Sequence, residues 1–150
     1  MTTTAPSLAL RLDDQWRTRD VEVTSVSADG ERRLRLRVDD GARWWADDAR
    51  RADLDGCVDV DVAATPLTNT LPIRRLASVG PGRPVTSPIA WVDVPALTVT
   101  RVDQTYERLE PMGGLDRWRY GDPAHGPFEL SVDTDGVVVD YEGFARRVIP

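Results

Sequence analysis

Apolar and polar residues alternate along most of the chain, which is the period-two pattern of strands with one buried face. In ERRLRLRVDD, residues 31–40, two leucines and a valine fall on one face and arginines fall on the other. The preceding DVEVTSVS alternates in the same way, and Asp29-Gly30 between the two runs is typical of a tight hairpin turn. These two segments are therefore predicted to pair as antiparallel strands.

The same alternation predicts further strands in CVDVDVAA (57–64), IAWVDV (89–94), LTVTRVDQTYERLE (97–110), DRWRYG (116–121), FELSVD (128–133) and VVVDY (137–141). Asp135-Gly136, between the last two, predicts a second hairpin. Helical spacing is confined to DDARRADLDG (47–56), where we expect a short helix. Prolines and glycines fall mostly between these segments, as turn residues do.

This pattern predicts one mainly β domain over residues 1–150, built from about eight to ten mostly antiparallel strands with at most one or two short helices. Residues 1–11 are expected to be poorly ordered. Because each strand has one apolar face, the sheet must curl or stack; a sandwich, a barrel and a curved roll all satisfy this requirement. An incompletely closed sheet would have a concave apolar face, which is the usual shape of a lipid or small-molecule site.

Composition excludes several classes of function. All 19 basic residues are arginine, yet the net charge is −6 with acidic residues interleaved throughout, which argues against a nucleic-acid partner. A single cysteine, Cys57, cannot form an internal disulfide. Neither a signal peptide nor an apolar run of transmembrane length occurs. We expect a cytoplasmic protein without an integral membrane segment.

Candidate chemistry is sparse. The only histidine, His125, lies in a loop-like segment, and no nucleophile-elbow, zinc-ligand or phosphate-loop spacing is present. We therefore expect no enzyme activity, no catalytic residues, no metal ligands and no cofactor. An alternative stays open, in which Asp59 and Asp61, two apart on one strand face, act as an acid and base pair on a sugar or acyl compound, with Asp140 as another candidate. A solvated outer face or ion pairs with arginine are the commoner roles of such residues.

Four segments carry a resemblance to a known family: CVDVDVAATPLTNTLPIRRL, DQTYERLE, DRWRYGD and FELSVDTDGVVVDYEGFARRV, in this order. On these motifs, residues 12–148 resemble the bacterial family of putative glycolipid-binding proteins. The resemblance implies a spiral β-roll with a curved sheet, related in shape to carriers of acyl chains, and an amphiphilic ligand such as a glycolipid. Relative to the family, the chain is expected to be shortened at its start, which would expose a sheet edge and favour a homodimer.

The segment TPLTNTLPIRRL, residues 65–76, places Arg74 and Arg75 side by side between apolar residues. Because Pro66 and Pro72 fix φ and lack a donor, we expect a stiff loop or a crossing at a sheet edge, with Asn69 bonding to local backbone. If this segment is extended, the two arginines point to opposite sides. One of them would then be buried against Asp59, Asp61 or Asp140, and the other would face a cavity or solvent.

The predicted ligand site combines these arginines with aromatic side chains. An arginine at a cavity mouth suits a polar head or sugar hydroxyls, and aromatic rings line the apolar part. The predicted ligand-binding residues are Asn69, Arg74, Arg75, Trp91, Tyr106, Trp118 and Tyr120. Two alternatives stay open: the arginines clip the fold through carboxylates, or the protein is an interaction scaffold whose concave face takes a partner's strand or helix.

Overall fold

The computed structural model describes residues 6–148; the first five and the last two residues lie outside the described part. The chain divides into two units. Unit 1 runs to Thr65 and includes Pro88–Val102, and unit 2 comprises Pro66–Ser87 and the chain from Asp103 onward. The prediction of one domain over residues 1–150 stays a prediction.

The elements of unit 1 are β1 (Ser7–Leu12), β2 (Thr18–Ser27), β3 (Gly30–Val38), β4 (Trp44–Ala46), β5 (Ala49–Arg50), the 3-10 helix η1 (Ala52–Leu54) and β6 (Asp59–Val62). Those of unit 2 are the 3-10 helix η2 (Leu67–Asn69), α1 (Thr70–Arg75), β9 (Leu115–Gly121), β10 (Phe128–Val132), β11 (Val138–Tyr141) and β12 (Ala145–Arg146). Both units contain residues of β7 (Val85–Val92) and β8 (Val99–Met112). The mainly β class with short helices is confirmed.

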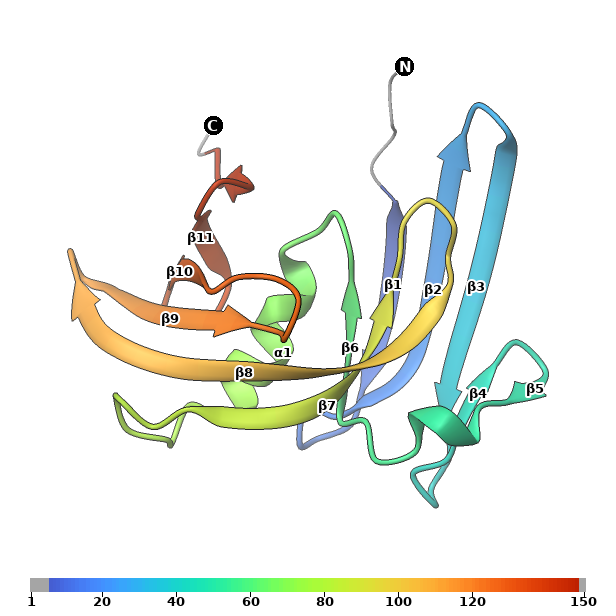
Figure 1. The fold of residues 1–150 in the computed structure, drawn as a ribbon, viewed down its shortest axis with the longest axis horizontal. Helices are drawn as coiled ribbons and strands as arrows, with labels where there is room; N and C mark the ends of the chain where they lie inside the picture. The colour runs from blue at the N-terminus through green and yellow to red at the C-terminus, as the bar shows by residue number, and fades with distance from the viewer. Residues whose placement is uncertain (1–5, 149–150) are drawn as a thin grey trace. The chain divides into compact units, whose positions relative to one another are not determined.

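Unit 1 contains a sheet in the order β1-β2-β3-β4-β5, and its first strands lie side by side in Figure 1. The predicted hairpin is confirmed, because β2 and β3 pair antiparallel from Asp20↔Arg37 to Ser27↔Gly30. Val21 and Leu36 are partners on the buried face, while Arg35 donates to the carboxylate of Asp20 on the other face. Alternation along these strands therefore decides which side chains enter the core.

The start of the chain differs from the sequence prediction of poor order over residues 1–11. Ser7–Leu12 form β1, which pairs with β2 through Leu8↔Val23 and Leu10↔Val21. The leucines of β1 are half-buried and the residues between them are exposed, so the strand alternates like its neighbour. The prediction for residues 1–5 lies outside the described residues.

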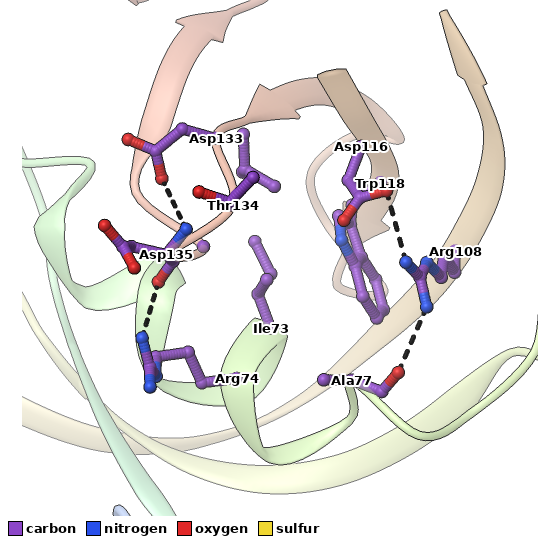
Figure 2. Close-up of a pocket in the computed structure, with 11 residues that line it drawn as sticks. Ile73, Arg74, Ala77, Arg108, Asp116, Trp118, Asp133, Thr134 and Asp135 are labelled. Atoms are coloured by element: carbon purple, nitrogen blue, oxygen red, sulfur yellow. Dashed lines mark hydrogen bonds and ion pairs between the residues drawn. The ribbon is translucent and has the colours of Figure 1, made fainter. Parts of the chain in front are cut away.

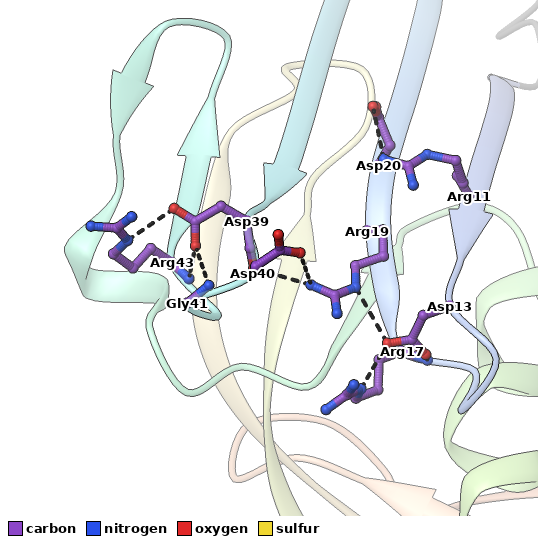
Figure 3. Close-up of polar contacts among 9 residues, drawn as sticks. All are labelled: Arg11, Asp13, Arg17, Arg19, Asp20, Asp39, Asp40, Gly41 and Arg43. Carbon is purple, nitrogen blue, oxygen red and sulfur yellow. Dashed lines mark hydrogen bonds and ion pairs between the residues drawn. The ribbon is translucent and has the colours of Figure 1, made fainter.

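Two turns of unit 1 repeat one pattern, Asp-Asp-x-x-Arg, at residues 13–17 and 39–43 (Figure 3). In the second turn, Asp39 Oδ1 accepts hydrogen bonds from the backbone N–H groups of Gly41 and Arg43, and Oδ2 accepts from Arg43 Nε. The fourth residue of each turn, Trp16 or Ala42, has a positive φ of 63° or 58°. The aspartate thus holds a backbone conformation that side chains other than glycine rarely adopt.

Arg19 of β2 connects these two turns, donating to Asp13 Oδ2 at 3.3 Å and to the backbone oxygen of Asp39 at 3.0 Å (Figure 3). The backbone N–H of Arg17 donates a hydrogen bond to Asp13, and this bond is the largest cause that lowers the pKa of Asp13 from 3.8 to about 2. The ionised carboxylate is therefore the form that the folded turn favours.

Two further expectations for unit 1 are corrected. The segment 47–56 forms no α-helix: β5 and the 3-10 helix η1 divide it, because its short apolar pattern supplies only one buried leucine, Leu54. β6 pairs with β7 in parallel, through Asp59↔Ile89, which agrees with the expectation of mostly antiparallel strands, since the other strand pairs with a described register are antiparallel. A solvated outer face does not describe Asp59, whose exposed fraction is 1 %, although Asp61 is half-buried.

Unit 2 is an antiparallel array in the order β8-β9-β10-β11-β12, and its second predicted hairpin, β10–β11, is confirmed. One face of this array is apolar, since cross-strand partners such as Leu130 and Trp118 point the same way. Helix α1 packs on this face, where Ile73 and Leu76 join the buried cluster of Trp118, Leu130 and Val132. Each of the two aliphatic side chains contributes about 1.5–3 kcal/mol by its burial.

The segment between Pro66 and Pro72 is helical, which corrects the expectation of a loop or an extended crossing. Pro72 is the third residue of α1, within the first turn, where a missing backbone donor costs nothing. Leu71, Pro72 and Ile73 are buried, while Arg74 is exposed and Arg75 half-buried. Since consecutive helical residues are about 100° apart, the arginines do not point to opposite sides.

Candidate functional site

A pocket of about 220 Å³ lies in unit 2 between α1, the strands β8 and β9 and the turn that joins β10 to β11 (Figure 2). Its floor is apolar, with Ile73, Trp118 and Val132, and its walls carry charged side chains from separate elements. The lining residues come from α1, the segment after it, β8, β9, β10 and the β10–β11 turn. The pocket is therefore a product of how α1 packs.

One wall is formed where α1 meets the β10–β11 turn. Arg74 Nη1 donates a hydrogen bond to the backbone oxygen of Asp135 at 3.0 Å. Gly136 of the turn is buried and has φ +77°, and a Cβ at this position would stand 3.1 Å from Arg74 Cγ and 3.3 Å from Ile73 Cγ2. Only glycine allows helix and turn to approach this closely without displacement.

Asp133 organises the same turn from within. Its Oδ1 accepts hydrogen bonds from the backbone N–H groups of Asp135 and Val137, both at 3.0 Å, and Arg147 donates to Oδ2 at 2.9 Å. Burial acts to raise the pKa of Asp133, but these hydrogen bonds outweigh it, so the pKa is lowered. The Asp133 carboxylate is thus held in its ionised form by groups of the turn itself.

The opposite wall is formed by Arg108 of β8. Its Nη1 donates to the backbone oxygen of Ala77 at 3.0 Å, and its Nη2 donates to Asp116 Oδ1 at 3.1 Å (Figure 2). The guanidinium lies over the ring of Trp118, 6.0 Å from the centroid. Arg108 therefore ties Ala77, two residues beyond α1, to β9 and covers the tryptophan, whose exposed fraction is 2 %.

The sequence of residues 2–147 matches a family model described as "Putative glycolipid-binding". The chain belongs to this family. A crystal structure of a DUF1089 family protein from Pseudomonas aeruginosa is similar to it, with a TM-score of 0.80 and 32% sequence identity over 93% of this chain and 74% of that one. No curated protein matches the sequence. The resemblance carried by the four motifs is thereby confirmed.

Of the ligand-binding residues predicted in this family member, Arg74 and Trp118 line the pocket. Asn69 and Tyr106 lie inside unit 2, where Asn69 Nδ2 donates to the Tyr106 hydroxyl at 2.8 Å. Tyr120 stacks on Tyr106, with centroids 5.1 Å apart, and its hydroxyl is hydrogen-bonded to that of Tyr141. These three side chains pack the face that α1 covers.

The other two predicted residues do not line this pocket. Arg75 is half-buried on α1, and Trp91 is half-buried on β7 in unit 1. That these seven predicted residues form a ligand site stays a prediction. Sequence reasoning missed Arg108 and Asp116, whose alternating strands gave no sign of a site, and it read Asp133–Gly136 only as a hairpin turn.

The carboxylates of the enzyme alternative lie on different elements. Asp59 and Asp61 belong to β6 of unit 1, and Asp140 belongs to β11 of unit 2, where Arg146 donates to it at 3.1 Å. His125 is exposed in the β9–β10 loop, and its ring nitrogen Nδ1 lies 3.2 Å from Asp122 Oδ1. Within residues 6–148, no group of three or more histidine, cysteine, aspartate or glutamate side chains is arranged to hold a metal ion. No helix of that range is long and apolar enough to cross a membrane.

Proposed function

We propose that this protein is a non-catalytic binding protein for an amphiphile, and that the pocket of unit 2 holds the sugar head of a glycolipid. Membership of the family supports an amphiphilic ligand. The pocket supports the position of the head, because it joins an aromatic and aliphatic floor to walls of arginine, aspartate and threonine. Sugars offer this same combination, with apolar ring faces and hydroxyl groups around the rim.

The size of the pocket limits what it holds. Its volume is about 220 Å³. Pockets that enclose a whole drug-sized ligand measure about 300–1,000 Å³. The pocket is therefore large enough for a sugar ring, whereas the hydrocarbon chain of the same amphiphile extends out of it.

The proposed site differs from the position expected from sequence, which was the concave apolar face of the sheet. The apolar face of unit 2 is already covered by α1, since Ile73 and Leu76 are 3 % and 8 % exposed within the cluster that includes Trp118. A chain lying flat on that face would displace the helix and its buried side chains. Binding beside α1, in the pocket, leaves this packing intact.

The protonation state of Asp133 supports binding without catalysis by this residue. A general acid at neutral pH needs a raised pKa, as burial without compensating hydrogen bonds provides. Asp133 shows the reverse, since the backbone of Val137 and the guanidinium of Arg147 lower its pKa. Such a carboxylate accepts hydrogen bonds and keeps the turn in shape.

The proposal is tested with a substitution that fills the pocket. Ala77 is exposed and lines the pocket, so Ala77→Phe places a ring in it with little effect on folding. Ser78→Phe is the matched control, because Ser78 is also exposed and is not a lining residue. Native mass spectrometry after incubation with bacterial lipid extract should show a glycolipid adduct on the wild type and on Ser78→Phe, and at least a fivefold lower occupancy on Ala77→Phe, at about 1 kcal/mol per factor of five.

Equal occupancy in Ala77→Phe and the wild type would place the ligand elsewhere and overturn the assignment of the pocket. A wild type that carries no adduct after incubation would contradict the binding function itself. Thermal unfolding of both variants, compared with the wild type, confirms that loss of the adduct does not follow from loss of the fold.

A further inference from the structure

We propose that the pocket selects an uncharged, hydroxyl-rich head group and rejects a phosphorylated one. This inference rests on the proposed function and adds to it the charge class of the head. It follows from the hydrogen-bonding groups that line the pocket: the guanidinium groups already donate to oxygens of the protein, and carboxylate oxygens of Asp116 and Asp135 are open.

The guanidinium groups of the pocket donate to the protein's own oxygens. Arg108 donates hydrogen bonds from Nη1 to the backbone oxygen of Ala77 and from Nη2 to Asp116 Oδ1. Arg74 donates to the backbone oxygen of Asp135. Arg147, at the edge of the turn, donates to Asp133 Oδ2 and to the backbone oxygen of Val137. An anion that sought these donors would compete with bonds that hold both walls together.

Two of the three lining carboxylates, those of Asp116 and Asp135, are in the opposite situation. Asp116 uses Oδ1 for Arg108, and its Oδ2 takes no hydrogen bond from the described residues. The side-chain oxygens of Asp135 take none either, and Asp135 lies exposed at the pocket's edge. Thr134 adds a hydroxyl, which both donates and accepts. The open groups of the pocket are therefore mostly carboxylate oxygens, which bind hydroxyl donors.

Charge leads to the same conclusion. Among the lining carboxylates, Asp116 pairs with Arg108 and Asp133 pairs with Arg147, which leaves Asp135 as the lining carboxylate without an ion pair among the described residues. A neutral sugar brings hydroxyl hydrogens to the open oxygens and forms charge-assisted hydrogen bonds. A phosphate brings only oxygens and negative charge to the same places, and like charges in contact strongly oppose binding.

The test compares two probes with the same tail, n-octyl β-D-glucopyranoside and n-octyl phosphate, each titrated below its micelle concentration into ¹⁵N-labelled protein. We expect the glucoside to shift the amide resonances of Thr134, Asp135 and Gly136. We also expect the Kd of the glucoside to be at least about tenfold lower than that of the phosphate. The reason is that the glucoside gains hydrogen bonds to the carboxylate oxygens, whereas the same oxygens repel the phosphate.

Asp135→Asn probes the acceptor directly. The variant keeps the backbone oxygen that Arg74 uses, and the Asp135 side chain has no hydrogen bond within the described chain, so folding should be unchanged. Exchanging a charged acceptor for a neutral one should raise the glucoside Kd about fivefold and narrow the gap between the probes. Asp103→Asn is the control, since Asp103 is exposed on β8 and is not a lining residue.

The outcomes separate the two proposals. If n-octyl phosphate binds as tightly as the glucoside or more tightly, with shifts at the same turn, the selectivity is wrong and the head-group site stands. If neither probe shifts these amides, the pocket is not a head-group site and both proposals fail. An Asp135→Asn variant that behaves like Asp103→Asn would remove Asp135 from the recognition and overturn the acceptor argument.

Discussion

Gly136 offers the sharpest test of how α1 and the β10–β11 turn fit together. Gly136→Ala adds a single methyl group to a buried residue with φ +77°, beside Arg74 and Ile73. The left-handed conformation costs an alanine about 1–2 kcal/mol, of which about 0.4–1 kcal/mol is offset by the smaller conformational entropy of the unfolded chain. The backbone contribution is therefore about 1 kcal/mol of destabilisation.

The steric contribution comes on top of this. The new Cβ would lie 3.1 Å from Arg74 Cγ and 3.3 Å from Ile73 Cγ2, which is closer than ordinary van der Waals contact. Arg74 is exposed and can move, but Ile73 is 3 % exposed and packed in the cluster beneath α1. A shift of a few tenths of an ångström at such a residue adds about 1 kcal/mol. The expected loss for Gly136→Ala is thus about 2 kcal/mol.

Gly143→Ala isolates the two contributions. Gly143 has φ +70°, close to that of Gly136, and nothing lies within 4 Å of a Cβ built on it. Urea unfolding monitored by tryptophan fluorescence should therefore give a loss of about 1 kcal/mol for Gly143→Ala and about 2 kcal/mol for Gly136→Ala. Equal losses would refute the close approach of α1 to the turn, and with it the wall of the pocket that Arg74 forms.

The turns of unit 1 give two more predictions. Ala42→Gly should stabilise the protein by about 0.5–1 kcal/mol, because Ala42 has φ 58°, whereas Ala124→Gly, at a loop residue whose φ is not positive, should destabilise it; a loss in both variants by urea unfolding would contradict the role of φ. Asp13, whose pKa falls from 3.8 to about 2 on folding, contributes stability above pH 3.8 that disappears as the pH falls toward 2. The difference in unfolding free energy between wild type and Asp13→Asn should therefore be constant at neutral pH and shrink over that acid range. A difference that grows as the pH falls would contradict a lowered pKa of Asp13 in the folded protein.

Much of the strand structure could be predicted because its signal is local. The alternation in residues 31–40 and the Asp29-Gly30 turn act within a few residues, and the structure pairs β2 with β3 as expected. The Asp135-Gly136 turn between β10 and β11 was predicted for the same reason. The motif around Pro72 also identified the family from the sequence alone, and the family match over residues 2–147 confirmed it.

The helix in that same motif could not be predicted. α1 has six residues, too few for a helical period to stand out, and two prolines lie close by. It is helical because its apolar residues Leu71 and Ile73 find a buried face, and because Pro72 sits in the first turn, where no backbone donor is needed. A side chain's environment decided the conformation, and that environment is built by strands far away in sequence.

By itself, the sequence determined the mainly β class, the hairpins and the family, since each depends on spacing along the chain. Tertiary structure alone decided that Asp59 is buried, that Ser7–Leu12 pair with β2, and that Arg74, Arg108, Asp116 and the Asp135 turn surround one pocket. The physical reason is that burial and proximity depend on which surfaces pack together. That packing sums weak contacts between residues distant in sequence, and no local pattern records it.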